Sequence, residues 1–164
     1  MKKKLWLVAT GLILSIAIGL LVYQLVFRGS PDIRLPLAET CLLHLEPCAS
    51  ELPGGGKIIF EINPKQPSPT EILYLSARFE QVEPTAVRVS FKGETTNMGY
   101  LEYVKYELRR DDTNDASILF SGQGGLSVCI SGLMKWVALV DIQVGETIYE
   151  VPFKFETTYT FNNA

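Results

Sequence analysis

The chain has 164 residues, with 15 basic and 18 acidic residues and a formal net charge of −3. The first 28 residues hold four of the basic residues and no acidic ones, so the remaining 136 carry 11 basic against 18 acidic groups. Such an acidic surface repels phosphate backbones, and no basic patch with interleaved aromatic residues appears, which excludes nucleic acid as an expected partner. The length of the acidic part suits one domain.

The N-terminal segment, residues 1–28, has the pattern of a membrane anchor. Lys2, Lys3 and Lys4 precede a charge-free, mostly apolar run at residues 5–27. In a helix these 23 residues would reach about 34 Å, enough for a hydrocarbon core of roughly 30 Å. No cleavage pattern of small residues follows, so we expect an uncleaved transmembrane helix. The lysines predict a cytoplasmic N-terminus in a bacterial inner membrane and a periplasmic C-terminal domain.

After the anchor, residues 29–38 are predicted as a linker and residues 39–164 as one periplasmic domain. The domain shows short runs rich in β-branched and aromatic residues, separated by turn residues. The predicted strands are residues 40–45, 57–62, 72–79, 86–92, 101–109, 117–121, 126–130, 136–144 and 147–156, with turns at 53–56 and 122–125. The last two strands are predicted to form a hairpin across Gly145-Glu146, and Trp136 is predicted as a core residue. In the strand at 86–92, Val87, Val89 and Phe91 alternate on one face. The number and spacing of these strands predict an all-β fold, an immunoglobulin-like two-sheet antiparallel sandwich.

Three cysteines follow the anchor: Cys41, Cys48 and Cys129. In an oxidising compartment two of them are expected to form a disulfide. Six residues separate Cys41 from Cys48, and Pro47 among them can turn the chain back, so we favour this pair. Such a bridge contributes about 2–3 kcal/mol. Pairing of Cys129 with either of the others remains an alternative.

The unpaired cysteine suggests a soft-metal site. Cys129, Met134 and Met98 would supply one thiolate and two thioethers, a ligand set that favours Cu(I), and His44 is a candidate fourth ligand. The alternative is structural, because buried cysteine behaves as a small hydrophobe and methionine fills irregular gaps in a core. No metal-ligand spacing as tight as CxxC or HxxxH is present.

Catalytic templates are absent from the sequence. The chain has one histidine, and GxSxG, HExxH, Walker and GxGxxG patterns do not occur. Because no nucleophile and base can be paired, we do not expect an enzyme.

The order of motifs resembles a group of small bacterial membrane-anchored periplasmic proteins, broadly FixH-like and YtkA-like. The resemblance rests on the Cys-x6-Cys spacing, the glycine-rich turn, the proline-rich loop at 63–69, the Met98-Gly99 turn and the segment at 128–136, VCISGLMKW. It implies an association with copper and cytochrome oxidase maturation, with Cys129, Met134 and Met98 as metal-handling residues. One departure is Thr96, where the resemblance implies a second methionine.

Together these observations predict an accessory protein, held in the membrane by residues 5–27, that assists copper handling or respiratory oxidase maturation beside an inner-membrane complex. The alternative is a metal-free structural interaction module that docks a membrane protein complex through a sheet edge or a loop surface.

Overall fold

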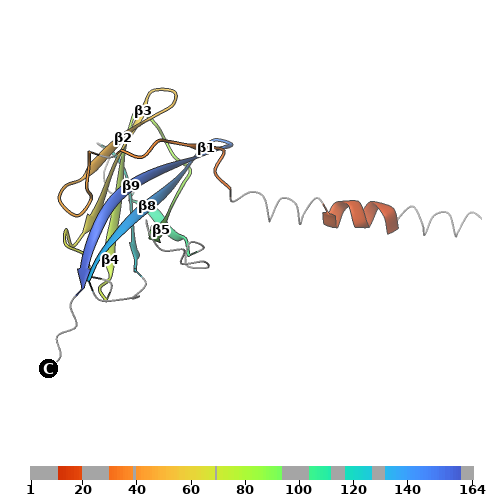
Figure 1. Ribbon diagram of the computed structural model, residues 1–164. Helices are drawn as coiled ribbons and strands as arrows, with labels where there is room; N and C mark the ends of the chain where they lie inside the picture. Colours follow the sequence, from red (N-terminus) through yellow and green to blue (C-terminus); the bar gives the residue numbers. More distant parts are fainter. Residues whose placement is uncertain are drawn as a thin grey trace, which may run out of the picture. The chain divides into compact units, whose positions relative to one another are not determined.

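The structure is a computed structural model, which describes residues 11–19, 30–38, 40–68, 70–93, 104–111, 117–126 and 132–159. The chain divides into two compact units, Met1–Ser30 and Pro31–Ala164. In the first unit residues 11–19 are helical (Figure 1). The other residues of the predicted span 5–27 lie outside the described part. The helices that the structure describes include none with both the length and the apolar character needed to cross a membrane.

The described residues of the second unit form nine strands, which confirms the predicted all-β class. The strands are β1 (Ile33–Arg34), β2 (Cys48–Leu52), β3 (Gly56–Asn63), β4 (Leu73–Glu80), β5 (Ala86–Gly93), β6 (Tyr106–Asp111), β7 (Ile118–Gly124), β8 (Gly132–Val144) and β9 (Thr147–Tyr159). The hairpin between β8 and β9 turns at Gly145, as the sequence predicted, and pairs along its whole length from Val144–Thr147 to Gly132–Tyr159.

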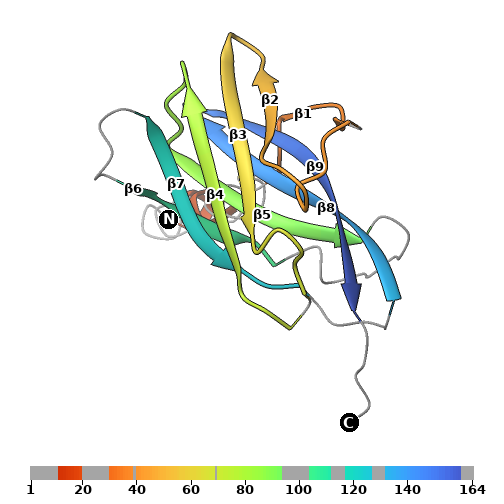
Figure 2. The same cartoon turned by 90° about the vertical axis from the view of Figure 1, so that its left-hand side faces the viewer.

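All nine strands belong to one sheet, in the order β1-β9-β8-β5-β6-β7-β4-β3-β2. This differs from the predicted pair of antiparallel sheets in two ways. β1 is parallel to β9, so the sheet is mixed. β6 joins the two halves, because Tyr106 and Leu108 pair with β5 whereas Arg109 and Asp111 pair with β7. The sheet therefore curls at β6, and β3, β4 and β7 lie in front of β5, β8 and β9 in Figure 2.

The core lies between the two halves of the curled sheet. Alternating residues of β3 and β4 are buried, as expected for strands with one face on a core. Phe60 of β3 stacks on Phe153 of β9 at 5.6 Å, which joins the two halves. Trp136, predicted as a core residue, is buried, stacks on Phe155 and donates its Nε1 proton to Thr157 Oγ1 at 3.0 Å.

Residues 32–38 and 40–44, which we call the edge strap, lie along the outer edge of β9. Asp32 N donates to Ile148 O at 2.9 Å, and Ile148 N donates to Asp32 Oδ2 at 2.8 Å. Further along, Leu43 N donates to Lys154 O at 2.9 Å. β1 is part of this strap and lies within the range predicted as linker. The strap satisfies backbone groups that a sheet edge would otherwise leave open.

The predicted strand at 40–45 is wrong. Its only ladder contact is the isolated bridge of Leu42 to Lys154, and residues 43–45 form a turn in which Leu45 N donates to Leu42 O at 2.9 Å. The chain bends here because it leaves β9 to reach β2. β2 itself was not predicted, since its sequence CASEL lacks an alternating pattern of apolar residues.

Two further boundaries differ from the prediction. β6 ends at Asp111, whereas the sequence placed the strand at 101–109; residues 101–103 lie outside the described part. β7 continues through Gly124, although 122–125 was predicted as a turn. Glycine is needed at Gly122 for packing, because a Cβ there would lie 2.7 Å from Leu108 Cδ2. Of the predicted strand at 126–130, only Leu126 belongs to the described residues, and it is not in a strand; residues 127–130 lie outside the described part.

Candidate functional site

The structure joins Cys41 to Cys48 in a disulfide, with an S–S distance of 1.98 Å and a Cα–Cα distance of 5.8 Å. This agrees with the pairing favoured from the sequence. Cys48 begins the edge strand β2, and Cys41 lies in the edge strap on β9, so the bridge ties the two ends of the curled sheet together. Leu43, between the cysteines, is fully buried and fills the space at this junction.

The predicted metal ligands lie only partly in the described part of the chain. Met134 is on β8 and is buried in the core. Cys129 and Met98 lie outside the described residues. His44 lies in the edge strap, where its Nδ1 accepts a hydrogen bond from the backbone N–H of Glu156 at 3.1 Å. Over the described ranges, no group of three or more His, Cys, Asp or Glu side chains could hold a metal ion.

A row of charged side chains crosses the outer face of the half-sheet that ends at β1. In strand register the row consists of Arg34, Glu150, Asp141, Arg88 and Glu107. Asp141 is buried on this face, and its Oδ2 accepts from Lys105 Nζ at 2.7 Å. Its other oxygen, Oδ1, has no hydrogen-bond partner in the described part of the chain.

Burial raises the pKa of Glu150 above the ordinary glutamate value, and the neighbouring carboxylate of Asp141 raises it further. The positive charges of Arg34, Lys105 and Lys92 oppose this increase without cancelling it. Glu150 and Asp141 are cross-strand partners, so two carboxylates share one partly buried position on the sheet. The surrounding cations bring the row close to neutrality, which indicates a structural charge network.

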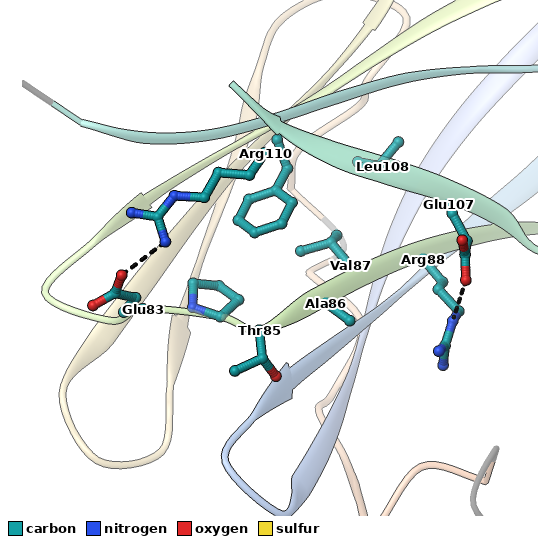
Figure 3. A pocket seen from close by; sticks show the side chains of 10 residues that line it. Glu83, Thr85, Ala86, Val87, Arg88, Glu107, Leu108 and Arg110 are labelled. Atoms are coloured by element: carbon teal, nitrogen blue, oxygen red, sulfur yellow. Dashed lines mark hydrogen bonds and ion pairs between the residues drawn. The ribbon is translucent and has the colours of Figure 1, made fainter. Parts of the chain in front are cut away.

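The described residues also line a pocket of about 480 Å³ at the place where the sheet curls. The ladder between β5 and β6 ends at the Val87–Leu108 pair, and the next residues of β6 pair with β7. The chain preceding β5 therefore separates from the end of β6, and the pocket opens between them (Figure 3). We call it the corner pocket.

Apolar groups form the floor of the corner pocket. They are Pro84, Ala86, Val87, Leu108 and Phe120. Two ion pairs flank this floor on opposite sides in Figure 3. Arg110 Nη1 lies 2.7 Å from Glu83 Oε1 on one side, and Arg88 Nε lies 3.3 Å from Glu107 Oε1 on the other. An apolar floor with a few charged groups at the rim is typical of binding pockets.

Sequence reasoning missed this pocket. Three of the four rim residues lie in β5 or β6: Arg88, Glu107 and Arg110. In the sequence, such charged residues are typical of the solvent-exposed face of any amphipathic strand. The available signal was Glu83-Pro84: the proline lacks an N–H and stands just before a strongly alternating strand. The proline indicates where strand pairing stops, but it does not indicate which residues of other strands face this position across the pocket.

We compared the chain with known protein families, with curated proteins and with solved structures, and none of the three comparisons found a match.

Proposed function

We propose that the protein is a membrane-anchored accessory protein of the bacterial inner membrane whose β domain is a non-catalytic binding module. The observation that carries this proposal is the corner pocket, with its apolar floor between two ion pairs. Such a pocket suits one large apolar side chain of a partner protein. The partner is a protein of an inner-membrane complex, which the anchor would keep within reach.

The anchor is supported by the composition and conformation of the first unit. Residues 11–19 are helical, and five large apolar side chains in this segment are more than half exposed: Leu12, Ile13, Leu14, Ile16 and Ile18. A helix that is apolar on all sides requires apolar surroundings, which a bilayer provides. The lysines at the N-terminus support a cytoplasmic start and a periplasmic β domain. The Cys41–Cys48 disulfide suits that oxidising compartment.

Within the all-β class, the immunoglobulin-like sandwich is our proposal for the fold. Its support is the pairing pattern: β4 with β7, β5 with β8 and β8 with β9. These correspond to the B–E, C–F and F–G pairs of an immunoglobulin sandwich. The link through β6 is the main difference from two separate sheets. Immunoglobulin-like domains serve many functions, so the fold adds little to the functional argument.

The second candidate function is copper handling beside a respiratory oxidase, as the FixH-like and YtkA-like resemblance implies. One observation favours it: Gly93 and Gly132, described residues that flank the segments with Met98 and Cys129, lie at the same end of the sheet. β5 ends at Gly93, whose partner is Trp136 near the start of β8. Tyr106 of β6 links β5 to the end of β7. Its ring lies 5.9 Å from the ring of Phe91 in β5, and its hydroxyl donates to Gly125 O, just after β7, at 2.9 Å.

Titration of the full chain with Cu(I) under reducing conditions tests this candidate. Copper handling predicts weaker binding by Cys129→Ser than by the native chain, with Met134→Leu and Met98→Leu weakened in the same direction. Equal affinities for the native chain and Cys129→Ser would reject it.

Cross-linking in cells tests the docking function. The cross-linker p-benzoylphenylalanine replaces Thr85, at the mouth of the pocket, or the exposed Ala49 of β2 as a matched control. We expect one adduct at position 85, identified by mass spectrometry as a membrane protein, and none at position 49. Ala86→Trp, which fills the pocket, should abolish the adduct. Equal adducts at the two positions, or an adduct that survives Ala86→Trp, would contradict the proposal.

A further inference from the structure

The rim of the corner pocket presents carboxylates more than guanidinium groups to solvent. In one ion pair Glu107 is 75% exposed and Arg88 is 31% exposed. In the other Glu83 is 67% exposed and Arg110 is 44% exposed. Each glutamate therefore stands further into solvent than its arginine. The outermost charges on both sides of the mouth are negative, although the four residues together are neutral.

Each glutamate also keeps one oxygen available. Oε1 of Glu83 and Oε1 of Glu107 contact the two arginines. Across the described ranges, neither Oε2 makes a hydrogen bond. A carboxylate can accept from two donors at once, so a bound cation can contact Oε2 without displacing the arginine. The excess of acidic residues beyond residue 28 adds a general attraction for cationic ligands.

The geometry of an extended peptide sets the spacing of such a ligand. Side chains alternate between the two faces of a strand, at about 3.3 Å per residue. If one apolar side chain enters the pocket, its immediate neighbours point away and the residues two positions before and after point to the same side. Those two residues lie about 6.6 Å along the chain on either side of the apolar one. They therefore lie on the same side of the peptide as the apolar residue, and point toward the rim of the pocket.

We propose that the corner pocket binds an extended peptide segment in which a large apolar residue stands two positions from a lysine or arginine on each side. The apolar side chain contacts Val87, Leu108 and Phe120, and the two cations contact Glu83 and Glu107. This inference rests on the proposed docking function and names the class of partner sequence.

Binding of synthetic peptides to the full chain tests the inference. The probe is a capped peptide, Lys-Ser-Phe-Ser-Lys, compared with versions in which serine or glutamate replaces both lysines and with one in which alanine replaces phenylalanine. We expect the affinity to fall in the order lysine, serine, glutamate, with at least tenfold between the first and the last. The advantage of lysine over serine should shrink in 0.5 M salt, because exposed charges are screened.

Variants of the protein make the test specific. Glu83→Gln and Glu107→Gln should each weaken binding of the lysine peptide about two- to fivefold, the range of an exposed ion pair, and should leave the serine peptide unaffected. Glu51→Gln, at an exposed position of β2, is the matched control and should change neither. Ala86→Trp should weaken both peptides.

Three results would overturn the inference. If the serine peptide binds as tightly as the lysine peptide, the charge specificity is wrong, and the docking function survives provided that Ala86→Trp still weakens binding. If Glu51→Gln has the same effect as Glu83→Gln, the attraction is general and does not belong to the pocket. If the phenylalanine and alanine peptides bind equally and Ala86→Trp changes nothing, the docking function fails as well.

Discussion

The hydrogen bond between His44 and Glu156 predicts how much the edge strap contributes to stability. His44→Ala removes the acceptor of the Glu156 N–H, a partly buried backbone donor at the outer edge of β9. A net intramolecular hydrogen bond contributes about 1 kcal/mol, which is roughly a fivefold change in the unfolding equilibrium. With a urea dependence of about 2 kcal/mol/M, the unfolding midpoint should fall by about 0.5 M.

The control is His44→Asn. The Oδ1 atom of asparagine is attached to Cγ as Nδ1 is in histidine, so it can accept the same proton without the rest of the ring. We expect His44→Asn to recover most of the lost stability. Amide hydrogen exchange gives a local measure, since the Glu156 amide should exchange faster in His44→Ala than in either other protein. Equal midpoints for the native chain and His44→Ala, or equal losses for the two variants, would refute this account of the histidine.

Two further predictions concern the disulfide and the charge row. Cys41→Ser with Cys48→Ser should lower the free energy of unfolding by about 2.5 kcal/mol, as expected for a short closed loop, whereas Cys129→Ser should not reproduce this loss in denaturant unfolding; the opposite pattern would mean that Cys129 is one of the paired residues. Glu150 has a pKa raised in the folded state, so its contribution to stability is greatest below the ordinary glutamate pKa of about 4.3 and decreases as the pH rises from there to the raised value. Glu150→Gln should remove this decrease, and a stability difference between the two proteins that is constant across that interval would contradict it.

The elements predicted well from the sequence are those with local patterns. The alternation of Val87, Val89 and Phe91 predicted β5 to within a residue at its end. The apolar run around Trp136 and the turn at Gly145 predicted the β8–β9 hairpin, because strand period and turn chemistry are both properties of short segments.

The features that the sequence missed depend on pairing between distant segments. Residues 40–45 are apolar enough for a strand, but the disulfide and the burial of Leu43 bend them off β9 after one bridge. The sequence of β6 does not indicate that its pairing partner changes from β5 to β7 after Leu108, because an alternating strand can pair equally well with either neighbour. The corner pocket follows from that change, so it could not be predicted. The placement of Cys129 and Met98 remains a prediction.

The outer edge of β9 and the corner pocket differ in what a partner could use, and this difference favours the pocket over strand addition at β9. Strand addition needs free backbone donors and acceptors along an edge. On β9 those groups are already bonded to the edge strap at Ile148, Lys154 and Glu156, and Pro152 between them has no N–H. A partner strand would first have to displace the strap, which the disulfide holds to β2. The corner pocket requires no such displacement, because no strand covers its opening between the chain preceding β5 and the end of β6, and its two glutamates are already exposed. A partner should therefore be recognised by its side chains, and the specificity should lie in the apolar residue and the charges around it.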